Sequence, residues 1–433
     1  MSSGFIGEVR IEGTVAPGFE SVKLLYEHNM RTLAEKNTQL CVYYKNEKVV
    51  DLWASASGDT EFSPDSLINV FSSGKSLAAI AMAWLVGEGL LNYQAKITDY
   101  WPEFAANGKG ELTVAELMRH EAGLAAFDTS IEPADLLRQN IKQNAVGKTI
   151  ENQSQKFREG AGNEREYHAI TRGWIANEIF RRVDPAGRTI GEFLSENIST
   201  PLQLDAVIGV PEKDLARVSK VSPLSLRFQF FESLKPKFLK RRIEHNIFQI
   251  LARVIRLIPA MRKSTTRGAP PPFSGMKGIG FFNEPAVAMG ETPSANANCS
   301  ARGLAKIAAM MSSGGNWNGN TYLNKTAWKA LHDQPKDADM MLSSTTFTQG
   351  GVALFQECSP NSSAIEKAFN QGREGYYGWM GFGGSIFQWH PGHEIGFGYV
   401  PTSLNVLDIL NERGKVYQAE VVKCVTSITG QSL

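Results

Sequence analysis

The chain has 433 residues, 42% of them hydrophobic, and its 45 basic side chains nearly balance 44 acidic ones. This length supports a large apolar core in one elaborated domain or two, and the near-zero net charge argues against nucleic acid as a partner. The sequence has no apolar run of the ~18 residues that span a membrane and no secretory signal, so a cytoplasmic protein is expected.

The first predicted elements are a helix and a hairpin. Residues 18–36 carry apolar side chains at helical spacing. Residues 39–44 and 49–54 are β-rich runs, and the four polar residues 45–48 between them predict a turn. One helix and two antiparallel strands therefore precede residue 70.

The stretch Phe71-Ser72-Ser73-Gly74-Lys75-Ser76 leads directly into the apolar run 77–85. A helix from near Ser72 to about Glu88 places Ser72 and Lys75 one turn apart on the same face. A lysine accepts a serine proton only when burial or neighbouring cations lower its pKa. The pattern therefore favours a nucleophile and its base, while the alternative is Ser72 as a helix cap and Lys75 as a solvated side chain.

Further helices are predicted at 113–120, 132–148 and 189–202, and Thr113 or the residue before it is expected to cap the first of them. His120 is either a catalytic base or a residue that fixes a loop by hydrogen bonding. The irregular segment 152–165 ends at Tyr167, where a helix begins. A side chain at such a junction can face a cleft.

Residues 222–272 differ in character from the rest of the chain. Ten basic residues lie between Lys235 and Arg267, and Glu244 is the only acidic one. Apolar residues at helical spacing form one stripe there: Ile243, Ile247, Ile250, Leu251, Val254 and Ile258. Such a helix most often packs its stripe on its own domain, but it can also contact an anionic membrane, form a lid or mediate assembly.

The C-terminal third predicts a helix at 300–311, a glycine-rich hairpin formed by 376–390 and 395–400, and a helix at 405–427. Four scattered cysteines favour a reducing compartment. The sequence has no histidine or cysteine cluster at metal-ligand spacing and no phosphate-binding loop. No metal and no cofactor are therefore expected.

These stretches together resemble the serine β-lactamase-like superfamily, in particular its class C β-lactamase and family VIII carboxylesterase branch. Four motifs occur in the expected order: Ser72-Ser73-Gly74-Lys75, the Leu117–Leu124 element around His120, Tyr167-His168-Ala169, and Trp379-Met380-Gly381 in place of Lys-Thr-Gly. The resemblance covers nearly the whole chain, from the hairpin at residue 39 to the final helix.

The resemblance implies an α+β fold of the β-lactamase/transpeptidase type, an α/β sandwich in which an antiparallel sheet is flanked by helices. We expect 1–433 to be a single domain. Within it, 15–75 and 340–433 would form an α/β subdomain, and 76–339 a mainly helical subdomain with a basic insertion at 222–272. The site would lie in the cleft between them.

The resemblance also implies roles for individual residues. Ser72 would attack an acyl carbonyl and form an acyl-enzyme, and Lys75 and Tyr167 would share the proton, Tyr167 as phenolate or relay. The backbone N–H groups of Ser72 and Phe382 would bind the oxyanion. Trp379, Gly381 and Ala169 would complete the substrate site.

Two departures from the β-lactamase pattern favour esters over penicillins. Trp379 replaces the lysine that would meet a β-lactam carboxylate, and Ala169 replaces an asparagine that could orient a substrate carbonyl. The expected partner is therefore a small acyl ester or amide. Amidase, peptidase or β-lactamase activity on the same site stays open, as does a non-catalytic scaffold that uses residues 235–267 for assembly or membrane contact.

Overall fold

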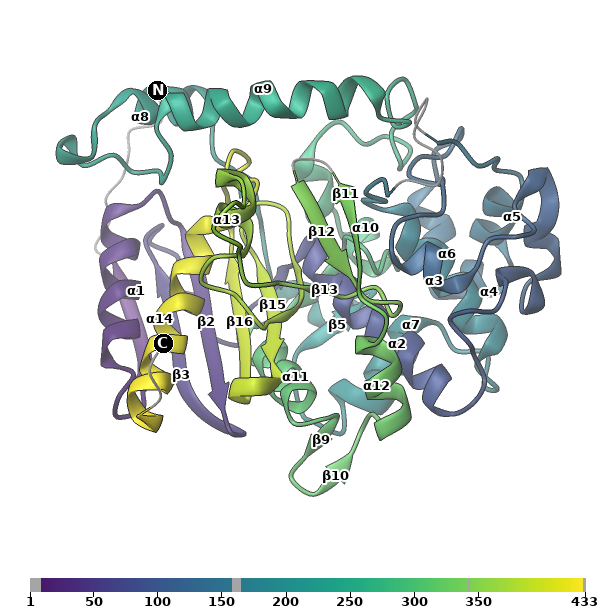
Figure 1. Ribbon diagram of the computed structural model, residues 1–433, viewed down its shortest axis with the longest axis horizontal. Coiled ribbons are helices and arrows are strands. Elements are labelled where there is room, and N and C mark those ends of the chain that lie inside the picture. The colour runs from purple at the N-terminus through teal and green to yellow at the C-terminus, as the bar shows by residue number, and fades with distance from the viewer. Residues whose placement is uncertain (1–8, 158–164, 341–342, 431–433) are drawn as a thin grey trace.

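A nine-stranded antiparallel sheet forms the centre of the computed structural model, which describes residues 9–157, 165–340 and 343–430 (Figure 1). In spatial order the strands are β1 (Arg10–Val15), β3 (Glu47–Ser55), β2 (Asn37–Tyr44), β16 (Ile395–Pro401), β15 (Ile386–His390), β14 (Tyr377–Met380), β13 (Ala353–Leu354), β12 (Ser343–Phe347) and β11 (Lys336–Met340). Residues 158–164 of the predicted irregular loop lie outside the described residues. The predicted α+β class and antiparallel sheet are confirmed.

The hairpin predicted near residue 39 is present as β2 and β3, but its turn is shorter than expected. Tyr44 pairs directly with Glu47, so only Lys45 and Asn46 form the turn. Both residues have left-handed φ values, of 49° and 63°. Two left-handed central residues match the right-handed twist of the flanking strands, and this explains why two residues suffice.

Helices cover both faces of the sheet. The helices α1 (Glu20–Thr32) and α14 (Glu412–Thr429) contact each other on one side (Figure 1), while α11 (Ala301–Ser312) packs on β16 and β2. A Cβ at Gly396 would lie 2.3 Å from the Ala309 nitrogen, so glycine in β16 permits this close contact. The predicted C-terminal helix starts later than residue 405, because the Asp408 carboxylate accepts N–H groups from Glu412 and Arg413 at its first turn.

A mainly helical region lies beside the sheet. Its helices are α2 (Gly74–Gly87), α3 (Val114–Met118), α4 (Arg138–Lys142), α5 (Ala145–Glu151), α6 (Thr171–Val183), α7 (Ile190–Leu194), α10 (Pro285–Met289) and α12 (Lys325–His332). A four-stranded sheet joins β5 (Ala206–Ile208), β8 (Ala297–Cys299), β4 (Leu67–Asn69) and β6 (Val218–Ser219). The remaining elements are the strand pairs β9 (Asn316–Trp317) with β10 (Asn320–Thr321) and β7 (Ser222–Pro223) with β17 (Ser403–Leu404), together with α13 (Ala364–Asn370).

Two predicted helices are interrupted. The segment 132–148 is a short 3-10 turn followed by α4 and α5, and Asn144 between these helices has a left-handed φ of 66°. The segment 189–202 leaves the α-helical form after Leu194 and continues as a π-helical turn. In contrast, Thr113 caps α3 through a reciprocal bond with Glu116, as predicted.

The basic segment forms α8 (Leu226–Leu234) and α9 (Ile247–Lys263), which lie along one edge of the molecule (Figure 1, top). Ile243 and Ile250 are buried, but Leu251, Val254 and Ile258 are 39–48% exposed. The expectation that the apolar stripe packs on the protein is therefore wrong for three of its six residues. Within α9, Ile250 and Arg253 face the protein, and Leu251, Val254 and Ile258 face outward. No helix among the described residues has the length and hydropathy needed to cross a membrane.

Candidate active site

Ser72 lies in a 3-10 turn that runs into α2, so the helix begins at Gly74 and not at the serine. The preceding residue, Phe71, has a left-handed φ of 47°, an uncommon conformation for a bulky side chain. Its N–H donates to Asn69 Oδ1 at 2.7 Å, which holds the bend. The turn leaves Ser72 partly exposed while its neighbour Ser73 is buried, so Ser72 faces the pocket.

Lys75 is buried, with 1% of its surface exposed. Its Nζ lies 2.9 Å from Ser72 Oγ, 2.6 Å from the Ala169 carbonyl oxygen and 3.0 Å from the Ser294 carbonyl oxygen. Burial, assisted by the positive charge of Arg172, holds the pKa of Lys75 well below its ordinary value. The alternative of a solvated first-turn lysine is therefore wrong.

The loop that carries Ser294 reaches Lys75 because two glycines permit it. A Cβ at Gly74 would lie 2.9 Å from the Pro293 carbonyl oxygen, and a Cβ at Gly173 would lie 2.5 Å from the Ser294 nitrogen. Neither Ser294 nor the buried Arg172 was singled out by sequence reasoning. Arg172 follows the Tyr167 motif, but its contacts with carbonyl groups of Met118, Gly351 and Lys75 come from distant segments.

Tyr167 lies just before α6 and is half-buried. Its hydroxyl accepts a hydrogen bond from Trp379 Nε1 at 3.0 Å, and its ring centroid lies 4.9 Å from Lys75 Nζ. Burial raises the pKa of Tyr167, although hydrogen bonds with Ser72 and Trp379 act in the opposite direction. The structure thus places Ser72, Lys75, Tyr167 and Trp379 together.

His120 is fully buried and holds neighbouring segments in place. Its Nδ1 accepts the His168 N–H at 3.0 Å, and its Nε2 lies 3.2 Å from Arg172 Nη1. His168 in turn accepts the Leu124 N–H at 3.0 Å. These contacts match the loop-fixing alternative, and they position the chain that carries Tyr167.

The end of β14 lies against the loop that precedes Ser72. A Cβ at Gly381 would lie 2.1 Å from Ser385 Oγ and 2.2 Å from the Val70 carbonyl oxygen, so only glycine fits. The next residue, Phe382, packs its ring 5.9 Å from that of Phe71. Within the described chain, the N–H groups of Ser72 and Phe382 donate to no protein acceptor. Both are therefore available to a bound oxygen.

The pocket at Ser72 has a volume of about 290 Å³. Its wall is mainly apolar, and the lining includes Tyr167, Leu257, Met340, Phe369, Trp379, Phe382, Ile409 and Leu410. Trp379 is 8% exposed and stacks near Phe347 and Phe369. Ala169 contributes its backbone carbonyl, which bonds Lys75, and offers no polar side chain.

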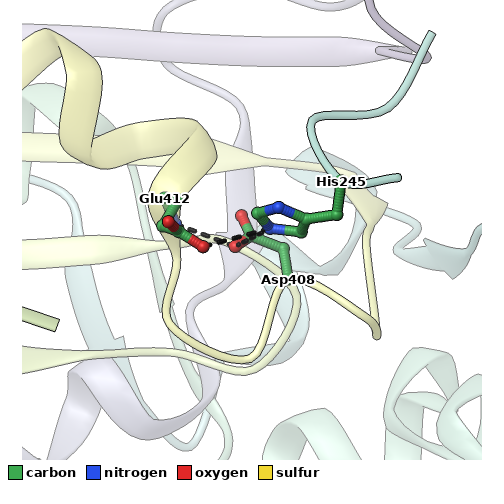
Figure 2. Close-up of side chains that lie close together, drawn as sticks. All are labelled: His245, Asp408 and Glu412. Carbon is green, nitrogen blue, oxygen red and sulfur yellow. Dashed lines mark hydrogen bonds and ion pairs between the residues drawn. The ribbon is translucent and has the colours of Figure 1, made fainter. Parts of the chain in front are cut away.

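Among the described residues, one group of side chains has the spacing of metal ligands: His245, Asp408 and Glu412 (Figure 2). His245 Nε2 lies 3.4 Å from Asp408 Oδ1 and 3.1 Å from Glu412 Oε2. However, the Arg253 guanidinium bonds Glu412 and lies 2.9 Å from His245 Nε2. Because this cation already contacts His245 and Glu412, the cluster forms an ion-pair anchor for α9 and does not suit a metal.

Comparisons with known proteins identify the family and the fold. The family described as Beta-lactamase matches residues 25–414. The Esterase/beta-lactamase LipL of Mycobacterium tuberculosis (strain ATCC 25618 / H37Rv) is 27% identical over 320 residues, which is 73% of this chain and 68% of LipL. A penicillin-binding protein homologue from Caulobacter crescentus has a TM-score of 0.73 at 27% identity, covering 96% of this chain and 100% of its own.

Two more distant structures support the fold alone. A family VIII carboxylesterase has a TM-score of 0.73 at 24% identity and covers 96% of this chain and 100% of its own. The D-amino acid amidase from Ochrobactrum anthropi SV3 has a TM-score of 0.59 at 15% identity, with coverage of 95% and 99%.

The family match begins before Ser72 and continues beyond Gly381, so its range spans the positions of all four predicted motifs. The predicted fold and the resemblance are confirmed, and the protein is a serine hydrolase. The chain belongs to the beta-lactamase family.

Proposed function

We propose that the protein hydrolyses carboxylic esters of uncharged acyl groups through an acyl-enzyme on Ser72. The observation that carries this proposal is the contact of Trp379 with Tyr167 at 3.0 Å, where β-lactamases would have a lysine. The described lining of the pocket contains no lysine or arginine side chain. A substrate carboxylate would thus be desolvated without a counter-charge, whereas an ester fits the apolar wall.

The contacts of Lys75 support its role as the base. The Ala169 and Ser294 carbonyl oxygens can only accept, so each takes one N–H from Lys75. A neutral amine has two N–H groups, and its lone pair then points along the remaining contact, 2.9 Å long, toward Ser72 Oγ. The lowered pKa favours this neutral form. Ser72 Oγ attacks the ester carbonyl carbon as its proton passes to Lys75 Nζ.

The oxyanion that forms would be bound by the N–H groups of Ser72 and Phe382. Removing one such donor from a hydrolase typically costs about 3–4 kcal/mol of transition-state stabilisation. Gly381 supports this arrangement, because it lets the end of β14 lie against Val70. Phe382 is 41% exposed and lines the pocket.

Tyr167 suits the role of proton relay to the leaving group. Its raised pKa favours the neutral phenol over the phenolate. As the acyl C–O bond breaks, the departing alkoxide takes the Tyr167 proton and leaves as alcohol, and the proton held on Lys75 restores the phenol. Water then attacks the acyl-enzyme by the same steps in reverse and releases the acid and free Ser72.

The test measures hydrolysis of p-nitrophenyl acetate, butyrate and octanoate beside a chromogenic cephalosporin and phenylalanine amide. We expect a burst of p-nitrophenol, its loss in Ser72→Ala, and weak turnover of the other two substrates. Ser76→Ala is the matched control, because Ser76 is a neighbouring serine within α2 whose buried hydroxyl has no hydrogen-bond partner among the described residues.

Other outcomes select the alternatives. Faster turnover of the amide or the cephalosporin, still dependent on Ser72, would replace the esterase by an amidase or a β-lactamase. Equal ester hydrolysis by wild type and Ser72→Ala would remove Ser72 as nucleophile. If none of the substrates is turned over, the scaffold hypothesis gains support.

A further inference from the structure

The outer side of α9 and the neighbouring α8 segment form an exposed apolar surface. Twelve of the sixteen large apolar residues that are strongly exposed in the described chain lie between 226 and 261. We define the outer face by the six that belong to α9, which are 39–78% exposed: Phe248, Leu251, Val254, Ile255, Ile258 and Met261. Phe238, in the connection between α8 and α9, is 82% exposed. So much clustered apolar surface marks a binding site.

The charges around the outer face have one sign. Exposed basic residues between 235 and 267 include Lys237, Lys240, Arg256, Arg262, Lys263 and Arg267. Two acidic residues lie between 226 and 267, and both are occupied or shielded: Glu232 is buried against Lys235, and Glu244 is partly buried. The partner of this face is therefore both apolar and anionic.

The orientation of α9 is fixed from its inner side. Arg253 is 8% exposed and bonds Glu412, and Ile250 is buried beside it (Figure 2 shows the Glu412 cluster). The helix consequently lies along an edge of the molecule (Figure 1), and the side chains of the outer face are exposed. Its 17 residues include four basic ones and a proline, so it suits a position in a membrane interface and not a membrane span.

We propose that α8 and α9 dock the protein on an anionic lipid bilayer, with the outer face among the acyl chains and the basic residues at the headgroups. A second copy of the chain would bury the apolar outer face but would not neutralise the basic residues around it, because symmetric pairing would bring two sets of lysines and arginines together. An anionic bilayer both buries the apolar side chains and neutralises the basic ones.

The experiment is co-sedimentation of the full-length protein with vesicles of phosphatidylcholine, with or without about 30% phosphatidylserine. We expect binding only to the anionic vesicles, and its loss at high salt because surface charges are screened. Phe248→Ser/Ile255→Ser should weaken binding at least about tenfold, since two apolar side chains no longer enter the bilayer. Arg256→Glu/Lys263→Glu should remove the preference for anionic lipid.

Matched controls lie elsewhere on the surface. Leu24 on α1 is 66% exposed, close to the 64% of Ile255, and Lys325 is exposed on α12, far from α9 in Figure 1. Leu24→Ser and Lys325→Glu should bind like wild type. Ser72→Ala should also bind like wild type, because the measurement involves no turnover and is independent of the esterase proposal.

Three results would overturn the inference. The first is no binding to anionic vesicles even at low salt. The second is binding that neither α9 variant reduces. The third is a dimer, measured by light scattering, that Phe248→Ser/Ile255→Ser converts to monomer, since the outer face would then be occupied by a second copy.

Discussion

The helices α2 and α9 are both rich in apolar residues, and each has one buried cation, but they are used in opposite ways. In α2 eleven of fourteen residues are buried, among them Lys75. In α9 only Ile250 and Arg253 are buried. Apolar content therefore does not decide whether a helix enters the core. Whether a helix is buried depends on whether the rest of the protein offers a surface against which it can pack.

The two buried cations differ in their partners. Lys75 contacts two carbonyl oxygens and a hydroxyl, and none of these carries a negative charge that would offset its burial. Arg253 contacts the Glu412 carboxylate. Burial without a counter-charge lowers a lysine pKa and produces a proton acceptor, whereas burial beside a carboxylate retains a fixed ion pair.

The largest expected effect is a difference in enzymatic activity between variants of Lys75 and variants of Arg253. Lys75→Met should lower kcat/KM for p-nitrophenyl butyrate by about 10³, the usual size of a general-base contribution. Lys75→Arg should be equally inactive, because an arginine does not release its proton near neutral pH. Arg253→Met should stay within a few-fold of wild type in the same assay. An active Lys75→Arg variant would contradict the assignment of Lys75 as base.

The second prediction compares the same substitution in both helices. Ile80 in α2 is 1% exposed and Ile255 in α9 is 64% exposed. Ile80→Ala should cost about 2–5 kcal/mol of unfolding free energy, since it leaves a cavity. Ile255→Ala should change it by less than about 0.5 kcal/mol. Urea unfolding measures both, and equal losses would mean that the outer face of α9 is packed in solution.

The third prediction concerns the anchor of α9. Arg253→Met should destabilise the protein by about 1–3 kcal/mol, because Glu412 then loses its partner in a partly buried site. Adding Glu412→Gln should recover much of that loss. The double-mutant cycle gives the coupling energy directly, and additive losses would show that the pair is not coupled.

The smallest expected effect is a pH dependence near the start of α9. Burial, reinforced by the Asp408 carboxylate, raises the pKa of Glu244 to about 7. Between about pH 4.3 and 7 the folded state then keeps a proton that the unfolded chain releases, so wild-type stability falls as pH rises. Glu244→Gln should therefore gain stability relative to wild type on moving from pH 5 to pH 8. A difference that is constant with pH would mean an ordinary pKa at Glu244.

Predictions from the sequence were most accurate for residues whose relative positions depend on local spacing along the chain. One helical turn brings Lys75 to Ser72, and the junction at Tyr167 does face the pocket. The partners of Lys75 were not predictable, because the Ala169 and Ser294 carbonyl groups arrive from segments far along the chain. Every residue has a backbone carbonyl group, so the sequence does not indicate which of these groups will bond Lys75. Gly74 and Gly173, which admit the Ser294 loop, were the nearest clue.

Periodicity also explains the principal error. The periodicity correctly predicted which residues form the apolar stripe, but it did not predict that Leu251, Val254 and Ile258 face outward. That direction depends on Arg253 meeting Glu412, and the partners are separated by 159 positions. The broken helices at 132–148 and 189–202 have the same origin, since a helical pattern continues across a residue such as Asn144 that turns the chain.

Leu257 gives α9 a second connection, because its side chain lines the pocket of Ser72 while the same helix presents the outer face. A ligand in the pocket and a partner on the outer face thus share one rigid element. If α9 shifts when one of them binds, the affinity for the other changes, and thermodynamic reciprocity requires the same factor in both directions. In that case the two surfaces of this helix would form a linked pair of binding equilibria.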